Sequence, residues 1–286
     1  MMEPRLSAAY DYCLSLARLH YENFPVASRI LPADRRPAIA AVYAFARLAD
    51  DMADEGTLDE AERLRQLDDW QKRLDHAVSG SAEHPVFEAL MDTMARYSVP
   101  PQLFSDLLVA FRQDVTKRRY ESFADLLSYC RCSANPVGRI VLHVFNEARA
   151  KNLLWSDAIC TALQLANFWQ DISVDNRKGR IYAPLEDLAR FRYTPEEIGQ
   201  NVEDERFRGL MQFEVERTCA LFREGAPIVR NVSKPLRFEL ALTWHGGMRI
   251  LQLIKNQGYR VLSARPKLGT YDGLLVVLRS ILKTPQ

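Results

Sequence analysis

The sequence has few glycines, no long hydrophobic run and no excess of one charge. Its 12 glycines among 286 residues accompany a hydrophobic pattern of period 3.6 that continues almost throughout. No stretch of about 18 apolar residues is present, so we expect no transmembrane helix. The 38 basic residues nearly balance 37 acidic ones, which argues against a global field that recruits nucleic acid. Any polyanion site must therefore be local.

Cysteines and targeting signals are also scarce. The five cysteines are odd in number and scattered, which favours a reduced, cytoplasmic protein over a disulfide framework. Cys130 and Cys132 form a C-x-C pair, but no second Cys or His pair stands near them to complete a zinc site. The first residues lack the charged, apolar and cleavage segments of a signal peptide. We expect a soluble cytoplasmic protein.

The hydrophobic pattern predicts a chain of helices and no strands. No β-type alternation, internal repeat or low-complexity linker interrupts it. We therefore expect one all-α domain over residues 1–286, a helical bundle with short loops. The predicted helices cover residues 7–19, a segment after Pro37 that reaches Ala49, and residues 61–77, 85–97, 102–112, 122–132, 136–145, 155–174, 206–222 and 236–254.

The second predicted helix ends in a cluster of acids. Asp50 and Asp54 are four residues apart and so share one helical face, with Arg47 and Tyr43 one and two turns earlier. Two carboxylates on one face repel unless a cation lies between them, and Mg²⁺ favours one or two carboxylates. The alternative is a solvated helix end, although a C-terminal end is unfavourable for negative charge. We call Asp50 and Asp54 the first aspartate motif.

A second cluster makes the metal interpretation stronger. Gln164, Asn167, Asp171 and Asp175 step by three, four and four residues, which places them in one polar stripe on a largely apolar helix. Such a stripe is costly to bury unless a ligand or counter-charge satisfies it. The alternative is a buried side-chain network, which rarely gathers two carboxylates without a counter-charge. We call Asp171 and Asp175 the second aspartate motif.

Together the two motifs predict a diphosphate site. If the two helices face each other across a bundle, their aspartates would hold two or three Mg²⁺ ions and a diphosphate. Arg47, Lys178 and Arg180 would neutralise the remaining phosphate charge. Apolar side chains lining the bundle would surround a hydrocarbon chain and guide a carbocation.

These motifs, in this order, resemble the squalene/phytoene synthase family from about His20 to Tyr259. The resemblance implies a fold of the isoprenoid synthase type with a central active-site cavity, in which both aspartate motifs bind Mg²⁺ and a prenyl diphosphate. The matching segments are His20-Tyr-Glu-Asn-Phe24, Ala41 to Asp54, Asp114 with Arg119-Tyr120, Tyr129-Cys130, Val137-Gly138, Gln164 to Asp175, and Gly179 to Pro184.

The resemblance also implies roles for individual residues. Substrate binding is expected of His20, Asn23 and Phe24, which match a loop that closes over the diphosphate, and of the pocket positions Tyr43, Arg47, Gln164, Asn167, Arg180 and Tyr259. Catalytic roles are expected of Tyr43, Arg47, Asn135 and Asn167.

Three segments resemble the bacterial hydroxysqualene synthase branch, which serves hopanoid biosynthesis: HYENFPVAS, YCRCSANPVGR and SDAICTALQLANFWQDISVD. That branch would ionise presqualene diphosphate and quench the rearranged cation with water. Cys132 stands where the wider family has a tyrosine implicated in the condensing half-reaction, and a thiol does not replace a phenol. Pro136 is expected to kink a helix. No dinucleotide fingerprint for NADPH is evident, and Asn135, Tyr43 and the diphosphate remain candidates to accept the water's proton.

Two rival functions remain at this point. One is a head-to-head condensing synthase of the same family, acting on farnesyl or geranylgeranyl diphosphate. The other is a noncatalytic relative that acts as an assembly factor, although such proteins lose the aspartates that this chain retains. A lipid substrate implies peripheral contact with the inner face of the membrane, and neighbouring hopanoid-pathway enzymes as partners, although the sequence shows no clear amphipathic anchor.

Overall fold

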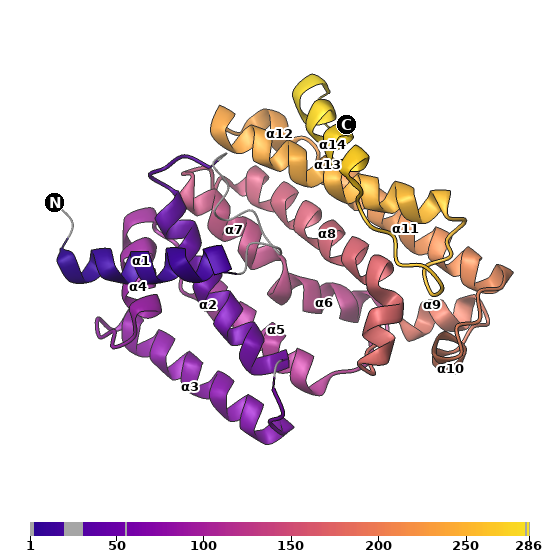
Figure 1. Cartoon of the computed structure of the whole chain (residues 1–286), viewed down its shortest axis with the longest axis horizontal. Helices are drawn as coiled ribbons and strands as arrows, with labels where there is room; N and C mark the ends of the chain where they lie inside the picture. Colours follow the sequence, from indigo (N-terminus) through magenta and orange to yellow (C-terminus); the bar gives the residue numbers. More distant parts are fainter. Residues whose placement is uncertain (1–2, 20–30, 55, 284, 286) are drawn as a thin grey trace. The chain divides into compact units, whose positions relative to one another are not determined.

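The chain folds into helices, as its hydrophobic period predicts. The computed structural model describes residues 3–19, 31–54, 56–283 and 285 of the 286-residue sequence, and these ranges contain no β-strand (Figure 1). The helices are α1 (Pro4–Leu19), α2 (Arg36–Asp54), α3 (Glu60–Val78), α4 (Pro85–Tyr97), α5 (Gln102–Thr116), α6 (Phe123–Ser133), α7 (Asn135–Val144), α8 (Ala150–Arg177), α9 (Leu185–Arg190), α10 (Pro195–Gly199), α11 (Glu205–Gly225), α12 (Ile228–Asn231), α13 (Lys234–Asn256) and α14 (Thr270–Leu282).

Capping residues explain several helix starts. Asp59 accepts a hydrogen bond from the backbone N–H of Glu62 at the start of α3, and Ser122 does the same for Asp125 in α6. The helix is interrupted directly before Pro136, as the predicted ranges 122–132 and 136–145 imply: α6 ends at Ser133, and Pro136 lies in the first turn of α7. Its missing N–H costs little there, since the first N–H groups of a helix have no intrahelical acceptor.

The helices form two compact units. The first contains Met1–Thr116 and Pro136–Arg149, and the second contains Lys117–Asn135 and Ala150–Gln286. The first aspartate motif belongs to the first unit and the second motif to the second unit. The single domain expected from the sequence, with the two motif helices facing each other, stays a prediction.

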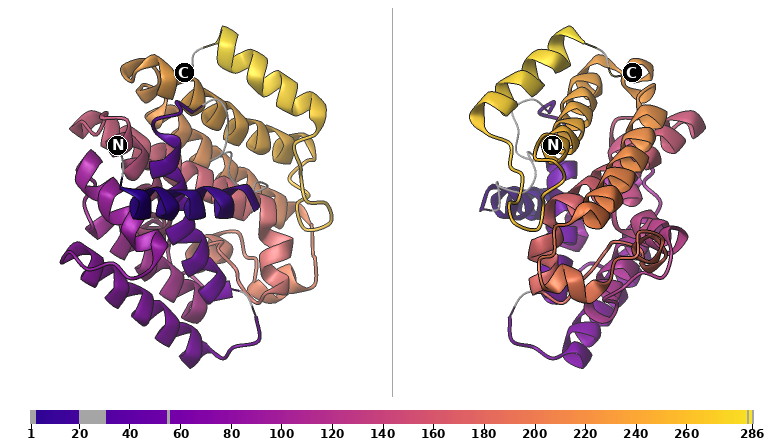
Figure 2. Two further views of the ribbon diagram at one scale, coloured as in Figure 1. Left: turned by 60° about the vertical axis from the view of Figure 1, so that its left-hand side comes forward. Right: turned by 90° about the vertical axis from the view of Figure 1, so that its right-hand side faces the viewer.

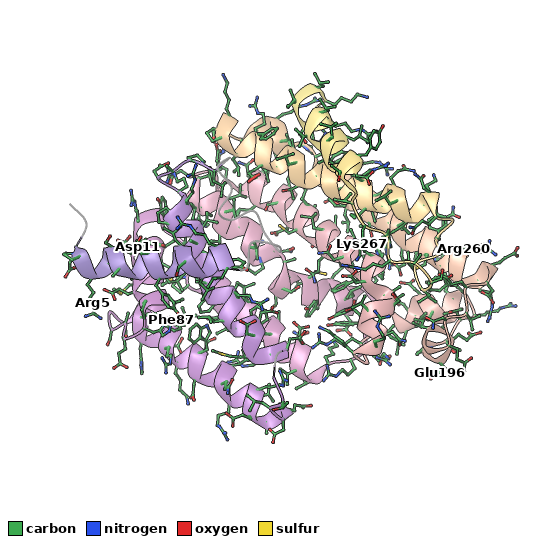
Figure 3. The ribbon with its side chains drawn as sticks, in the orientation of Figure 1. Arg5, Asp11, Phe87, Glu196, Arg260 and Lys267 are labelled. Atoms are coloured by element: carbon green, nitrogen blue, oxygen red, sulfur yellow. The ribbon has the colours of Figure 1, made fainter. Side chains whose placement is uncertain are left out.

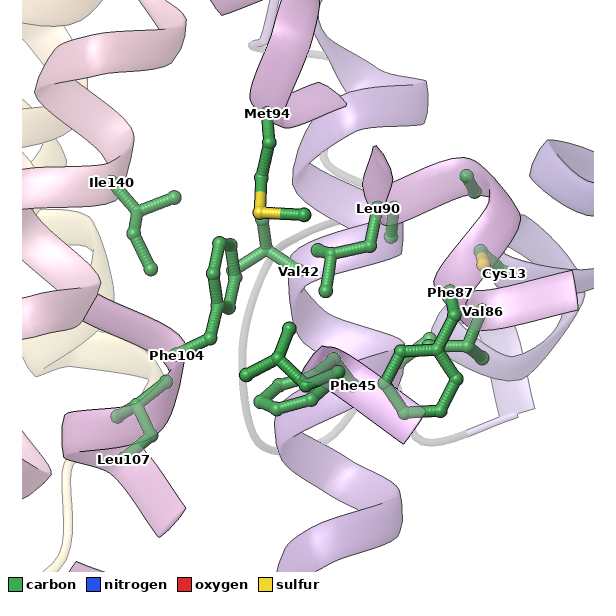
Figure 4. Packing of buried hydrophobic residues seen from close by; sticks show 14 of the residues in the cluster. Cys13, Val42, Phe45, Val86, Phe87, Leu90, Met94, Phe104, Leu107 and Ile140 are labelled. Carbon is green, nitrogen blue, oxygen red and sulfur yellow. The ribbon is translucent and has the colours of Figure 1, made fainter. Parts of the chain in front are cut away.

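The first unit is built around α2. This helix is buried on most of its circumference, as its sequence predicts, and its Phe45 is fully buried. The Phe45 ring lies 5.4 Å from the ring of Phe104 and 5.9 Å from those of Trp70 and Phe87, on three other helices (Figure 4). Burying one such side chain stabilises the fold by roughly 2 kcal/mol. The core therefore fixes the position of α2 and of the acids at its end.

The second unit is built around α8, which packs against α11 and α13. The packing is close because glycine lies at two contacts. A Cβ on Gly225 of α11 would come within 2.5 Å of the Ile159 side chain of α8, and one on Gly247 of α13 within 3.0 Å of the Leu163 side chain of α8. The fully buried Trp169 of α8 donates a hydrogen bond to the Thr218 hydroxyl of α11 at 2.8 Å. These contacts fix the rotation of α8 and hence the direction of its polar stripe.

Candidate functional site

The first aspartate motif lies at the C-terminal end of α2. The helix ends at Asp54, and the Asp50 side chain is 49% exposed. The carbonyl end of a helix carries partial negative charge, to which the carboxylates add. The local structure therefore concentrates negative potential where a cation would be stabilised.

Arg47 lies one turn before the motif and pairs with its acids. Its guanidinium is 2.5 Å from a carboxylate oxygen of Asp51 and 3.6 Å from one of Asp50, and the Arg47 side chain is only 15% exposed. The contact with Asp51 was not anticipated, because Asp51 was not among the predicted metal ligands. Arg47 is thus held at the motif, as expected of a residue that would meet a diphosphate.

Tyr43 lies one turn further back and is half-buried. Burial raises the pKa of its phenol, Arg47 lowers it, and Asp51 and Asp50 raise it again, so that the net shift is upward. The phenol therefore stays protonated at neutral pH. It can donate a hydrogen bond but is a poor proton acceptor.

Arg63 of α3 hydrogen-bonds to the backbone of the turn that follows the motif. Its side chain donates to the carbonyl oxygens of Ala53 at 2.7 Å, of Gly56 at 3.0 Å and of Leu58 at 3.0 Å. The last carbonyls of a helix have no partner within the helix, and a guanidinium satisfies them while offsetting their negative charge. Sequence reasoning missed Arg63 because backbone acceptors leave no signal in a sequence.

The second aspartate motif lies near the end of α8. Asn167 is exposed and Gln164, Asp171 and Asp175 are half-buried, so the stripe is accessible. Of the apolar residues that flank the stripe, Leu165, Phe168, Trp169 and Ile172 are buried as expected, whereas Leu163 and Val174 are half-buried.

Arg265 pairs with the second motif from the connection between α13 and α14. Its guanidinium contacts both carboxylate oxygens of Asp171, with Nη2 3.0 Å from Oδ2. Gln170 donates to the carbonyl oxygen of the next residue, Pro266, at 2.7 Å. The two contacts hold this connection against the polar side of α8. Arg265 was not among the predicted site residues, because 94 positions separate it from Asp171.

Asn135 lies at the junction of α6 and α7, where it contacts α8. Its side-chain oxygen accepts a hydrogen bond from the Thr161 hydroxyl at 3.0 Å, and both residues are buried. Thr161 is three residues before Gln164 and extends the polar stripe by almost one turn. The structure therefore brings the predicted catalytic residue Asn135 to the stripe.

Aromatic residues from separate segments meet beside α8. Tyr182 stacks on Phe168 of α8 at 3.7 Å between ring centroids and on Tyr120 at 5.6 Å, and Tyr129 lies edge-on to Tyr120 at 5.6 Å. The expected motif segments around residues 120, 129 and 182 are thus neighbours.

The same packing holds the segment that carries Arg180. The N–H of Ile181 donates to the carbonyl oxygen of Arg118 at 3.1 Å, and Arg119 donates to the carbonyl oxygen of Gly179 at 2.6 Å. Gly179 has φ of +75°, which glycine adopts without strain. The predicted diphosphate ligand Arg180 is therefore half-buried on a fixed segment that follows α8 directly.

A buried charged cluster lies on α11, the helix that packs against α8. Glu214 of α11 is fully buried, and Arg217 lies 2.6 Å from its carboxylate and 2.8 Å from that of Asp187. Burial raises the pKa of Glu214 to about 8, although the charge of Arg217 opposes this shift. The backbone oxygen of Glu214 accepts from the Thr218 hydroxyl, which binds Trp169 of α8. The cluster and the contact with α8 therefore lie on the same turn of α11.

The remaining predicted residues fall elsewhere. Tyr259 follows α13 with a left-handed φ of 62°, and its pKa is raised by burial and by the nearby Glu216 and Cys219 of α11. It is half-buried, and its role in substrate binding stays a prediction. His20, Asn23 and Phe24 lie outside the described residues.

The acidic residues fit Mg²⁺ by the chemistry of their donors. Each motif offers carboxylate oxygens one helical turn apart, and Mg²⁺ takes one or two carboxylates while keeping waters and phosphate oxygens. Within the described ranges, no three His, Cys, Asp or Glu side chains gather into one metal-binding group. Each motif alone thus supplies part of a ligand set, and binding of two or three Mg²⁺ ions stays a prediction.

Comparison with known proteins agrees with this geometry. A model of the squalene/phytoene synthase family matches residues 17–272. A 15-cis-phytoene synthase of Synechococcus elongatus is 31% identical over 94% of this chain and 91% of its own length. A hydroxysqualene synthase of Rhodopseudomonas palustris is 36% identical over 87% of this chain and 82% of its own length. The crystal structure of a squalene synthase, HpnC, from Alicyclobacillus acidocaldarius superposes with a TM-score of 0.86 and a sequence identity of 40%. The match covers 90% of this chain and 97% of that protein.

The matched family acts on prenyl diphosphates. The all-α fold is that of the isoprenoid synthases. The chain belongs to the squalene/phytoene synthase family.

Proposed function

We propose that the chain is a hydroxysqualene synthase. It ionises presqualene diphosphate with the help of Mg²⁺, allows the cyclopropylcarbinyl cation to rearrange, and quenches the cation with water. The carbon–oxygen bond breaks with both electrons leaving on diphosphate, a water oxygen bonds to the rearranged cation, and one proton is released. The products are hydroxysqualene and diphosphate.

The observation that carries this proposal is Cys132. It lies one turn after Tyr129 on α6. By resemblance, it stands where the wider family has a tyrosine implicated in the condensing half-reaction. A thiol is smaller and a weaker hydrogen-bond partner than a phenol. Tyr129, one turn earlier on the same helix, packs against Tyr120 in the aromatic cluster. The 36% identity to a hydroxysqualene synthase, against 31% to a phytoene synthase, supports the same branch.

The site residues would have two roles, metal binding and diphosphate binding. Asp50, Asp54, Asp171 and Asp175 would hold Mg²⁺, which supplies positive charge to the departing diphosphate. Arg47 and Arg180 would pair with its remaining oxygens.

The proton released from the attacking water requires an acceptor. Because Tyr43 stays protonated, its phenol would donate a hydrogen bond instead of accepting a proton. Asn135 is an amide, which can orient water but is not basic. Of the three candidates, the departing diphosphate is left as the proton acceptor.

A product assay tests the proposal. The protein is incubated with presqualene diphosphate and, in parallel, with farnesyl diphosphate, with Mg²⁺ and with or without NADPH. A C30 alcohol formed from presqualene diphosphate without NADPH is the expected result. Presqualene diphosphate, squalene or dehydrosqualene formed from farnesyl diphosphate would overturn it.

A condensing synthase is the second candidate. It is favoured by the phytoene synthase of S. elongatus, which is 31% identical over almost the whole chain. Geranylgeranyl diphosphate is added as a third substrate for this reason, and phytoene would identify this activity. A noncatalytic assembly factor would yield no product from any of the three substrates, although the retention of all four motif aspartates argues against it.

A further inference from the structure

The C-terminal helix α14 exposes an apolar face. Tyr271, Leu274, Leu278 and Ile281 are spaced three, four and three residues apart, so they share one side of the helix. Their exposed fractions are 73%, 59%, 45% and 65%. Leu282, at 77%, widens the same face. A soluble helix usually turns this kind of face inward.

The opposite side of α14 already has a partner. Asp272 and Val276 are buried, and Arg249 of α13 pairs with the Asp272 carboxylate at 2.5 Å. Figure 2 shows α14, in yellow, lying along α13 at the margin of the second unit. The ion pair, Val276 and the half-buried Leu275 thus hold the helix in place, while the apolar side chains of the other face remain exposed.

The charge of this region is also unusual. Residues 255–286 contain six basic side chains and one acidic one, whereas the whole chain has 38 basic and 37 acidic residues. Asp272, the acidic one, is paired with Arg249. Arg260 and Lys267, on the connection before α14, are exposed (Figure 3). Lys283, directly after α14, is also exposed. The apolar face is therefore bordered along the chain by positive charge.

We propose that the outer face of α14 docks on the surface of an anionic lipid bilayer. A helix with one apolar face and nearby basic residues lies in the bilayer interface, where apolar burial and attraction to anionic lipids both contribute. None of the described helices is long and apolar enough to cross a bilayer. A second copy of the chain fits less well, because pairing this face with itself would bring two positively charged regions together.

Docking would place the site's own loop at the membrane. The connection between α13 and α14 carries Arg265, which pairs with Asp171, and Pro266, whose carbonyl binds Gln170. Only four residues lie between Arg265 and Thr270, where α14 begins. The docking surface and the second motif are therefore joined by a short, fixed segment. The docking proposal does not depend on which prenyl diphosphate is the substrate.

Vesicle flotation tests the docking surface directly. The full chain is mixed with vesicles of phosphatidylcholine alone, or of phosphatidylcholine with phosphatidylglycerol at roughly 7:3. We expect flotation with the anionic vesicles. The double variant Leu274→Gln/Leu278→Gln should reduce the partition coefficient roughly tenfold or more. The matched control Leu154→Gln, at an exposed leucine of α8, should leave it unchanged.

Charge and self-association are tested separately. Lys267→Gln/Lys283→Gln should lower binding to the anionic vesicles several-fold, and circular dichroism shows whether each variant keeps its helices. Failure of the wild-type protein to float with anionic vesicles would overturn the proposal, as would undiminished flotation of the double leucine variant. A dimer in light scattering that dissociates in that variant, without any vesicle binding, would assign the face to a second copy.

Discussion

The two aspartate motifs are chemically alike but are supported differently. The first ends α2, and the arginines beside it, Arg47 and Arg63, come from the same helix and the next one. The second lies on α8, and its Asp171 pairs with Arg265, 94 residues away. One motif is thus stabilised within a helical hairpin, and the other by a contact that requires most of its unit to fold.

This difference separates two ways of holding a carboxylate before a ligand arrives. At the first motif Arg63 holds the helix end through backbone carbonyl oxygens, and Arg47 lies closer to Asp51 than to the motif residue Asp50. At the second motif Arg265 sits on the carboxylate itself and must share it with any metal ion. We therefore expect some mutations to change how the carboxylates are positioned and others to change how tightly they bind a metal ion.

The largest effect on turnover is expected from removing an aspartate, and it should be the same for both motifs. Asp50→Ala and Asp171→Ala should each lower turnover about a thousandfold, because each removes a ligand for the ion that would stabilise the leaving group. The midpoint of thermal unfolding should stay near that of the wild type. Steady-state rates and circular dichroism check both points.

Asp69→Ala is the matched control, since Asp69 is an exposed acid on α3. It should leave turnover unchanged. Full activity in either motif variant would exclude that aspartate as a metal ligand.

The next effect should be specific to the first motif. Arg63→Ala removes the donors to Ala53, Gly56 and Leu58, and we expect it to lower the free energy of unfolding by about 1–2 kcal/mol. Urea denaturation measures this loss. Arg65→Ala, at an exposed arginine of the same helix that pairs with Glu62, should change it by less than about 0.5 kcal/mol. Equal losses in the two variants would contradict the special position of Arg63.

A pH effect should be specific to the unit of the second motif. Burial raises the pKa of Glu214 to about 8, from an ordinary value of 4.5, so the folded chain holds this proton more tightly than the unfolded chain. The stabilisation is complete below about pH 4.5 and is lost as the pH rises to about 8. Between pH 6.5 and 8 the loss should be roughly 1–2 kcal/mol.

Denaturation of Glu214→Gln across this range isolates the contribution, because the amide cannot ionise. Its stability should vary less with pH than that of the wild type. Glu216→Gln, at an exposed position of the same helix, should follow the wild-type curve. Parallel curves for all three proteins would show that Glu214 does not titrate in this range.

The smallest effect tests occupancy at the second motif. Arg265→Ala should raise the affinity for Mn²⁺, used as a paramagnetic substitute for Mg²⁺, by about three- to tenfold, because a competing cation is removed from Asp171. Electron paramagnetic resonance of free Mn²⁺ measures this without any turnover. Lys267→Ala, an exposed basic residue two positions later, is the control. Unchanged or weaker binding in Arg265→Ala would show that Arg265 does not compete for Asp171.

The sequence predicted the elements with a strong helical period and local signals. The predicted segment 85–97 coincides with α4, where Pro85 begins the helix and Ser98 ends it in a left-handed conformation. Helix α14 was not among the predicted helices, because residues 274–278 form a continuous apolar run without a helical period.

Prediction of the site succeeded within helices and failed between them. The steps from Gln164 to Asp175 place those residues on one stripe by helical geometry alone. Arg63 binds backbone oxygens, and Arg265 reaches Asp171 only through the fold of the second unit. Neither contact has a periodic signature, so neither can be predicted from the sequence.

The separation between Asp171 and Arg265 also has a consequence for synthesis of the chain. At about 5–20 residues per second, Arg63 is made within roughly 2 s of Asp54, whereas Arg265 follows Asp171 by about 5–20 s. On the ribosome, the first acidic helix end is therefore neutralised almost as soon as it appears. The second must wait for most of its unit with its repelling carboxylates uncompensated by Arg265. The order of synthesis makes the second motif the later of the two to reach its final electrostatic environment.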